Sequence, residues 1–465
     1  MPLLLRSPFR QVLCAGLVAT VLIASPASPR PAAAQDSGGV GTGVGLIRDA
    51  EIESTIRTFA TPLWRAAGLD ASFIQINLVN SSQINAFVAG GQRLFINTGL
   101  LTRSQSPNQV IGVIAHETGH IAGGHLARSQ EALENATTQS IIGYVLGTAG
   151  AVLSRSGAVA SAAVLGTQSM ALRSLLAYSV GQEARADQAG MTFLDETNQS
   201  SRGLLEFFQV LEKQEVLLPA RQDPYLRTHP LTTERVDTVR AHVEKSPASK
   251  SQDSPELVMM HHRMVAKLVG FLAPIADVMK RYPLTDQSLP AHYARAIAYY
   301  RKPDLPKALE EINGLLKDHP DDPYFNELKG QMLFENGKVK EALLPYQTAA
   351  KLAPQASLIR VSLAQVQLEM NDPSLVKPAI AALKDAVRTD PDNSDAWHFL
   401  AIAQGRDNDI GNAALALAEE AVLAGDIRTA IQQASRATQL LPRGSPGWLR
   451  ADDISRDAKA TRNRS

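Results

Sequence analysis

Apolar residues in the first half of the chain follow helical spacing and then strand-like runs. Four of them recur every three or four positions between residues 46 and 69: Ile52, Ile56, Phe59 and Leu63. This spacing predicts an amphipathic helix, and the apolar runs 73–79 and 93–97 predict short β-strands. Residues 85–91 predict a further strand and turn between those two runs. We therefore expect a small β-sheet beside helices.

A second helix is expected to begin at Pro107. Ser106 precedes this proline and Gln109 follows Ser106 by three residues, which is the pattern of a helix capping box. The helical spacing of apolar residues continues along the same segment: Val110, Ile111, Val113 and Ile114. Residues that follow Ile114 are therefore presented on this helix.

Small residues and prolines repeat at regular intervals in the second half of the chain. Small residues occupy corresponding positions in four units: Ala296, Gly330, Ala364 and Ala401. Each unit has a second small residue and a closing proline: Ala308 and Pro320, Ala342 and Pro354, Ala379 and Pro391, Ala430 and Pro442. The first two steps, by subtraction, are 34 residues each, which is the period of the tetratricopeptide repeat. The third unit has about three extra residues, and the last has an extra helix around residues 412–424.

The polar run 245–256 separates these two unlike halves. It is rich in Ser and Pro and has no periodic apolar residues, which is typical of a linker. We therefore expect one domain over residues 35–244 and a helical repeat domain over residues 257–465. A repeat solenoid presents a concave face to partner peptides, so the second domain predicts binding rather than chemistry. We also expect it to fold without the first domain.

The first residues have the pattern of a cleavable signal peptide. Two arginines precede an apolar stretch over residues 12–24, and small residues at 32–34 follow it. We therefore expect residues 1–34 to be removed and the mature protein to lie in the periplasm. The single cysteine, Cys14, lies within the apolar stretch, so the mature chain has neither disulfides nor cysteine-based zinc sites.

The composition and the overall charge exclude several classes of protein. The hydrophobic content of 45% is that of an ordinary globular protein, which excludes collagen-like and disordered chains. Lys and Arg number 46, as do Asp and Glu, so the formal net charge is zero. Because the chain has no global positive field, we expect no nucleic-acid partner.

The candidate chemistry lies on the helix that begins at Pro107. Residues 116–120 have the sequence His-Glu-Thr-Gly-His. Residues four apart on a helix point about 40° from each other, so His116 and His120 can contact one metal ion while Glu117 projects beside them. This is the zinc-peptidase motif, and it predicts one zinc ion per chain.

A zinc site needs a third protein ligand, and the metzincin pattern does not supply it. That pattern has a histidine six residues after the second one, but Leu126 stands there and His125 falls one residue short. On a continuous helix His125 lies about 180° around from His116. We therefore expect His125 to pack or to hydrogen-bond rather than to bind metal.

The segment 183–187 offers two carboxylates that suit such a site. Glu183 and Asp187 lie four residues apart, which puts them on one face of a predicted helix. Glu183 can complete a His-His-Glu ligand set. Asp187 can accept the free ring N–H of a ligating histidine.

These motifs, together with residues 226–231 and Arg235, resemble those of the zinc metallopeptidases related to the CaaX prenyl endopeptidases and to HtpX. The signal peptide and the C-terminal repeats are similar to those of the soluble branch of that family, which serves β-barrel assembly in the bacterial periplasm. The resemblance covers nearly the whole mature chain. It implies a zincin-type domain with the HExxH motif followed by a helical tetratricopeptide solenoid, in a mainly α fold with a small β-sheet.

The resemblance also implies roles for individual residues. It assigns three zinc ligands: His116, His120 and Glu183. Glu117 becomes the catalytic base, and Asp187 supports a ligating histidine. His229 matches a family histidine that either occupies the fourth zinc position in a latent form or stabilises the oxyanion, and both roles remain open.

The residue types indicate how peptide hydrolysis would proceed. Glu117 would take a proton from a water activated by zinc and pass it to the leaving amine. The negative charge that develops on the substrate needs a donor, and His229 and Arg235 are the candidates. The strand 85–89 can pair with an extended substrate, which reads backbone rather than side chains and predicts broad specificity.

An apolar stretch rich in Gly and Ala covers residues 141–166. Arg155 divides it into pieces that are shorter than the roughly 20 residues of a membrane-spanning helix. Three interpretations remain open: a lid over the zinc, a patch that contacts the membrane or a misfolded substrate, and an ordinary core segment.

We therefore expect a periplasmic zinc endopeptidase that acts on unfolded or misassembled envelope proteins. Its repeats would contact the outer-membrane assembly machinery. One alternative is an assembly chaperone or adaptor that works mainly through its repeats, with latent proteolysis. Another is a protease of general quality control whose repeats serve only for oligomerisation.

Overall fold

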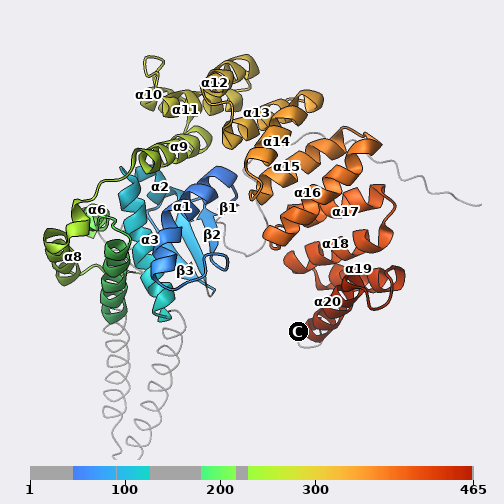
Figure 1. Cartoon of the computed structure of the whole chain (residues 1–465), viewed down its shortest axis with the longest axis horizontal. Coiled ribbons are helices and arrows are strands. Elements are labelled where there is room, and N and C mark those ends of the chain that lie inside the picture. The colour runs from blue at the N-terminus through green and yellow to red at the C-terminus, as the bar shows by residue number, and fades with distance from the viewer. Residues whose placement is uncertain (1–44, 91, 126–179, 216–228, 463–465) are drawn as a thin grey trace, which may run out of the picture.

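The computed structural model describes four stretches of the chain: residues 45–90, 92–125, 180–215 and 229–462. Within them, a group of helices around a small sheet forms the N-terminal half, and an arc of helical hairpins forms the C-terminal half (Figure 1). The predicted class, mainly α with a small β-sheet and helical repeats, is confirmed. The expected signal peptide, residues 1–34, and the apolar segment, residues 141–166, lie outside the described residues.

The sheet has four strands in the order β1-β2-β4-β3. Their bounds are β1 Leu46–Ile47, β2 Gln75–Val79, β3 Ala86–Ala89 and β4 Arg93–Asn97. The central strands β2 and β4 are parallel, while β1 and β3 pair antiparallel with them at the two edges. Three strands were predicted, and β1 was missed because two residues are too few to show a pattern.

Three helices pack around this sheet: α1 Ala50–Ala66, α2 Thr98–Arg103 and α3 Pro107–Ala122. The four apolar residues that predicted α1 are all buried. Helix α3 begins at Pro107 as expected, and the Ser106 hydroxyl accepts a hydrogen bond from the Gln109 backbone N–H. The side chain of Gln109 accepts from the backbone of Gln105 rather than of Ser106, so the capping box is only half formed. Helix α3 packs against α1 and β3.

The rest of the N-terminal half is helical. It comprises a helix seen over 180–196, α6 Arg202–Glu215, α8 Thr233–Lys245 and the short 3-10 helix η2 Pro247–Lys250. Ala248 and Ser249 of η2 are buried, so this part of the expected linker packs against the protein. Helix α9, Pro255–Leu272, follows, and its Met264 and Leu268 belong to the core of the N-terminal half. The domain boundaries stay a prediction.

The repeats consist of antiparallel helices joined by short turns: α10 Ile275–Arg281, α11 Leu289–Arg301, α12 Leu305–Asp318, α13 Pro323–Glu335, α14 Val339–Leu352, α15 Ser357–Glu369, the 3-10 helix η3 Pro373–Leu375, α16 Val376–Thr389, α17 Ser394–Arg406, α18 Ile410–Leu423, α19 Ile427–Leu440 and α20 Pro446–Arg462. The small residues that define the repeat are buried at the helix contacts. A Cβ on Gly330 would lie 2.7 Å from the ring of Tyr346, so α13 and α14 meet there because the position is small. No helix among these described stretches is long and apolar enough to cross a membrane.

Buried ion pairs hold the start of α1 against the first repeat helices. Glu51 pairs with Arg263 of α9 at 2.7 Å and accepts a hydrogen bond from the Tyr293 hydroxyl of α11 at 2.6 Å. Lys267 of α9 pairs with Asp49 at 2.8 Å. We call these five residues the α1 clamp. Both Glu51 and Lys267 are less than 5% exposed.

A second junction lies further along the arc, at the turn between α16 and α17. Asp390 pairs with Arg48 at 2.7 Å. Asp392 contacts both Gln75 of β2, at 2.8 Å, and Arg93 of β4, at 3.4 Å. Polar contacts therefore attach the N-terminal half to the repeats at the α1 clamp and at this turn, and Ala50 of α1 also shares a buried apolar cluster with Ala349 and Ile359 of the repeats.

Candidate metal centre

Helix α3 carries the first part of the site. His116 and Glu117 lie in its buried stretch and are 0% and 1% exposed. His120 is one turn further on and is partly exposed. The Nε2 atoms of the two histidines are 3.2 Å apart, so the helix presents both rings to one point, as the spacing predicted.

A close helix contact brings the second part of the site to α3. The helix over 180–196 crosses α3 at Gly119, the residue before the second histidine. A Cβ on Gly119 would lie 2.6 Å from the carbonyl oxygen of Ala186, a distance that no side chain tolerates. This approach places Glu183 beside the histidines.

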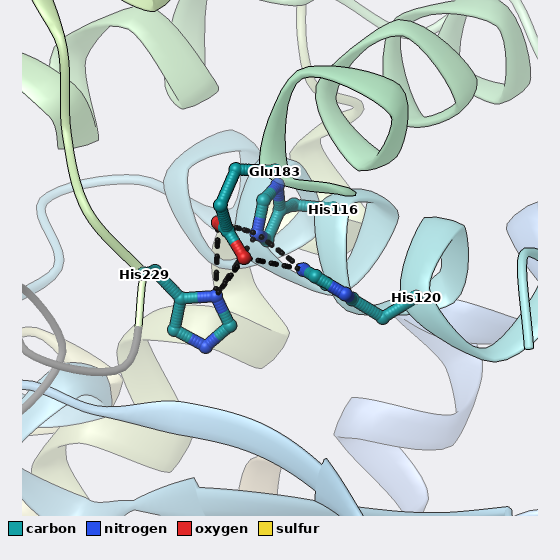
Figure 2. Close-up of side chains that lie close together, drawn as sticks. All are labelled: His116, His120, Glu183 and His229. Atoms are coloured by element: carbon teal, nitrogen blue, oxygen red, sulfur yellow. Dashed lines mark hydrogen bonds and ion pairs between the residues drawn. The ribbon is translucent and has the colours of Figure 1, made fainter. Parts of the chain in front are cut away.

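Four side chains converge on one point, as Figure 2 shows. Candidate ligand atoms of His116, His120, Glu183 and His229 all lie within 4.8 Å of one another. Glu183 contacts the three rings: Oε2 lies 3.3 Å from Nε2 of His116 and 3.1 Å from Nδ1 of His229, and Oε1 lies 3.2 Å from Nε2 of His120. The structure thus brings together the four side chains named as metal ligands from the sequence.

The outer nitrogen of His116 is held by a carboxylate. Its Nδ1 donates to Oδ1 of Asp187 at 2.7 Å, the contact that the sequence predicted for Asp187. Arg235 of α8 holds the same carboxylate through Nε at 2.6 Å and Nη2 at 2.9 Å. Its Nη1 donates to the carbonyl oxygen of Pro230 at 2.7 Å. These donors act on protein atoms, so the geometry favours a supporting role for Arg235 over that of an oxyanion donor.

His125 hydrogen-bonds, as expected, but not by the route that the sequence predicted. Helix α3 ends at Ala122, and Gly124 has a φ of +60°, so the chain turns back at this point. Nδ1 of His125 lies 3.0 Å from Nδ1 of His120. A continuous helix would have carried His125 away from the site, but the pair Gly123-Gly124 ends the helix, and glycine at this position is the local signal in the sequence that marks it.

Glu117 lies beside the cluster rather than in it. Its Oε1 is 3.6 Å from Nε2 of His229. Both carboxylate oxygens are buried, and within the described stretches they accept no hydrogen bond. Burial raises the pKa of Glu117. A buried carboxylate that lacks donors is suited to take up a proton.

The arrangement of lone pairs fits a cation. Because Nδ1 of His116 donates to Asp187, Nε2 of the neutral ring has a lone pair, and it faces Nε2 of His120 and a Glu183 oxygen. Three buried carboxylates, counting Glu117, lie near one buried guanidinium, that of Arg235. With neutral imidazoles this leaves two negative charges, which a divalent cation balances.

Hydrogen bonds within the cluster control its charge. Burial raises the pKa of Glu183, but hydrogen bonds from the three surrounding histidines outweigh burial and hold it far below its usual range. Burial lowers the pKa of His120 to about 4. Burial also lowers the pKa of His116, yet its bonds to Asp187 and Glu183 outweigh that effect and raise it to about 10. Near neutral pH a metal ion that binds Nε2 of His116 would therefore displace a proton from it. The carboxylate of Glu183 and the neutral ring of His120 are the forms that bind metal.

A buried HExxH helix, a glutamate on a crossing helix and a small adjoining sheet define a metallopeptidase domain, here joined to helical repeats. Residues 47–243 match peptidase family M48, and residues 292–357 match the tetratricopeptide repeat. The N-terminal half is therefore similar to the M48 peptidases over nearly all of its length, and the chain is a metalloprotease with tetratricopeptide repeats. The metal-ligand candidates all lie within the M48 match.

The chain is similar over most of its length to curated relatives. The β-barrel assembly-enhancing protease of Yersinia pestis is 26% identical over 418 residues, 88% of this chain and 83% of the relative. The protein of the same name from Escherichia coli K12 is 24% identical over 412 residues, with the same two shares. The resemblance to the soluble branch with repeats is thus confirmed. Among solved structures, yeast Tom70 is 12% identical. The match covers 77% of this chain and 86% of the Tom70 chain, with a TM-score of 0.31.

Proposed function

We propose that this protein is a zinc-dependent endopeptidase of the periplasm that acts in the assembly and quality control of outer-membrane and envelope proteins. One observation carries the proposal: four ligand side chains converge beside Glu117 in an M48 domain. The relatives named for β-barrel assembly span most of the chain, which supports the place of action. The expected signal peptide, residues 1–34, supports the periplasm.

Zinc is the metal that suits these ligands. His116, His120 and Glu183 form the His-His-Glu set that is typical of catalytic zinc, and His229 adds a third nitrogen at the same point. When bound, zinc supplies Lewis-acid activation of water and of the scissile carbonyl. We propose one zinc ion per chain.

The proton transfers belong to Glu117. Its buried carboxylate would accept a proton from the attacking water and deliver it to the nitrogen of the leaving amine. The raised pKa moves this group closer to neutrality, where it both accepts and releases a proton readily. The absence of hydrogen bonds to it from the described residues leaves both oxygens available for the exchange.

Asp187 and Arg235 would keep the ligands in place. The carboxylate of Asp187 fixes His116 in the tautomer that has a lone pair on Nε2. Arg235 fixes Asp187 and, through Pro230, the segment that begins with His229. For the developing negative charge on the substrate, His229 is then the better of the two donor candidates.

Strand β3 offers a place for an extended substrate. It lies at the edge of the sheet and packs on α3, the helix with the HExxH motif. Phe87, Val88 and Ala89 are partly exposed. Pairing along this edge would use backbone hydrogen bonds, so it would accept unfolded or misassembled envelope proteins of many sequences. We propose that the repeats contact the outer-membrane assembly machinery, with no nucleic-acid partner.

Glu117→Gln in the full chain tests this function. We expect about one zinc per chain to remain while hydrolysis of a denatured β-barrel protein falls by several orders of magnitude. The variant should also fail to restore outer-membrane assembly in a strain that lacks the gene. Full restoration would show that the repeats alone do the work, and the chaperone or adaptor alternative would then replace the peptidase.

A further inference from the structure

His125 lies behind a proposed metal ligand. It is outside the HExxH motif and only 4% exposed. Its Nδ1 is 3.0 Å from Nδ1 of His120, whose other nitrogen points into the ligand cluster. Gln182 donates to the His125 backbone carbonyl at 3.3 Å, so the helix that carries Glu183 also contacts this residue.

The end of α3 is shaped to bring this ring back onto the helix. Gly123 caps the helix, and Gly124 follows with a φ of +60°, a conformation that favours glycine. A Cβ on Gly123 would lie 2.4 Å from Nε2 of His125. Two consecutive glycines are therefore what allows the imidazole of His125 to reach His120.

The direction of the hydrogen bond follows from the cluster. For His120 to bind metal through Nε2, the neutral ring must carry its proton on Nδ1. Nδ1 of His120 then donates to Nδ1 of His125, whose own proton is on Nε2. His116 donates its outer proton to a carboxylate in the same way, so both histidines of the HExxH motif have an acceptor behind them.

We propose that His125 is a positioning residue of the metal centre, which fixes the tautomer and the ring orientation of His120 by accepting its Nδ1–H. The proposal rests on the metal site proposed above. Loss of such an outer partner typically weakens metal binding 10- to 100-fold without abolishing it. A neutral imidazole attracts the Nδ1 proton of His120 less strongly than the carboxylate of Asp187 attracts that of His116. The ligating nitrogen of His120 is then less basic, so His120 would be the weaker of the two histidine ligands.

The test compares two side chains of nearly the same shape at position 125. Asn places an acceptor oxygen where Nδ1 stood, whereas Leu has no acceptor. Zinc affinity of the purified full chain, measured by competition with a chromophoric chelator, should fall on the order of 10- to 100-fold in His125→Leu. In His125→Asn the zinc affinity should lie within a few-fold of that of the unsubstituted chain. His262→Ala, at an exposed histidine of α9, serves as the control for loss of a histidine.

The outcomes separate this inference from the site on which it rests. Equal zinc affinity of the Leu variant and the unsubstituted chain would overturn the role of His125. Equally weak zinc binding by the Leu and Asn variants would also overturn it, provided that their metal-free forms unfold at the same temperature as the unsubstituted chain. His116→Ala is measured in parallel. If that variant keeps its zinc, the proposed metal centre itself is wrong.

Discussion

Nε2 of His229 lies 3.6 Å from Oε1 of Glu117, while Nδ1 of the same ring lies 3.1 Å from Oε2 of Glu183. The ring therefore sits between the proposed base and a proposed ligand. An imidazole in this place occupies the space where a water and a scissile carbonyl would have to lie. The geometry favours the latent form of the site, in which His229 fills the fourth ligand position.

We expect His229→Ala to hydrolyse a denatured protein faster than the unsubstituted chain, because the substitution opens the fourth position. The measurement is the initial rate with zinc content determined on the same sample. If His229 instead stabilises the oxyanion, the rate falls on the order of 100-fold or more at full zinc occupancy. A decrease of that kind would refute the latent form, in which His229 fills the fourth ligand position.

Removal of a proposed ligand should remove the metal. His116→Ala and Glu183→Ala are each expected to lose most bound zinc, since each change breaks the His-His-Glu set and leaves only two of its members beside His229. Metal analysis after dialysis against a weak chelator measures this. Thr118→Ser, a conservative change between the two histidines, is the matched control. Zinc retained in both ligand variants would refute the assignment.

The contact between α3 and the crossing helix predicts an effect at a glycine. Gly119→Ala puts a methyl group 2.6 Å from the Ala186 carbonyl oxygen, so the helices must separate. Overpacking of this kind costs about 1–3 kcal/mol, and we expect both a lower free energy of unfolding and weaker zinc binding. Among the described residues, a methyl group at Gly181 of the crossing helix meets only the Arg185 side chain, at 3.9 Å, so Gly181→Ala should be neutral or slightly stabilising. Urea denaturation measures the free energy of unfolding of the two variants, and equal values would contradict the prediction.

The α1 clamp should contribute to stability across the two halves. Glu51→Ala removes one of the two carboxylate partners of both Arg263 and Lys267, which keep Asp322 and Asp49, and it removes the acceptor of the Tyr293 hydroxyl. Loss of such buried partners typically costs about 1–3 kcal/mol. We expect an earlier unfolding transition and faster proteolysis between the halves. Asp237→Ala removes an exposed ion-pair partner and should change stability by no more than about 0.5 kcal/mol. A Glu51 variant as stable as this control would show that the α1 clamp does not stabilise the protein.

The same contacts bear on the expected independence of the repeats. A fragment that begins at Pro255 lacks Asp49 and Glu51 and exposes the face of α9 that packs on the peptidase core. We therefore expect such a fragment to be folded but less stable than the repeats within the whole chain. Circular dichroism during thermal unfolding measures the difference.

Acid should weaken the junction between α2 and α9. His261 is 1% exposed, and its Nε2 lies 2.7 Å from the Ser104 hydroxyl. Because that hydroxyl donates to the Leu101 carbonyl, the ring must be the donor, which it remains as a neutral imidazole. Burial, with smaller effects of His262 and Arg281, lowers the pKa of His261 to about 4.

The folded-state pKa thus lies below the unfolded value of about 6.5. The stability from keeping His261 neutral is fully present above about pH 6.5 and is lost as the pH falls towards 4, up to about 3 kcal/mol. His261→Gln keeps a donor but does not titrate. Between pH 7.5 and 5 the unsubstituted chain should lose more stability in urea than this variant, and parallel losses would contradict the prediction.

Local patterns in the sequence predicted the elements that carry the site. The helical period placed His116 and His120 on one face of α3, and Ser106 marked where that helix begins. The i,i+4 spacing placed Glu183 and Asp187 together on the crossing helix. These predictions succeeded because each depends on residues within a few turns of one another.

Contacts between distant segments were beyond such patterns. The α1 clamp joins residues more than 200 positions apart, so neither Glu51 nor Lys267 carries a local sign of its partner. Residues 247–250 look like linker in composition, yet Ser249 is buried because its carbonyl oxygen accepts hydrogen bonds from Ser200 and Arg202. The return of His125 depends on one left-handed glycine rather than on a periodic pattern.

The crossing of the two helices at Gly119 also bears on when the proposed metal site can form. A ribosome that has released only α3 has made both histidines, but the chain still lacks Glu183 and the segment around His229. Until the crossing helix packs against α3 with Ala186 at Gly119, the nascent chain contains the HExxH motif but not the full set of proposed ligands. On the proposed ligand set we therefore expect peptidase activity only in the finished fold, and its loss as soon as those two helices separate. A chain in transit or in the course of unfolding would then not cleave its neighbours.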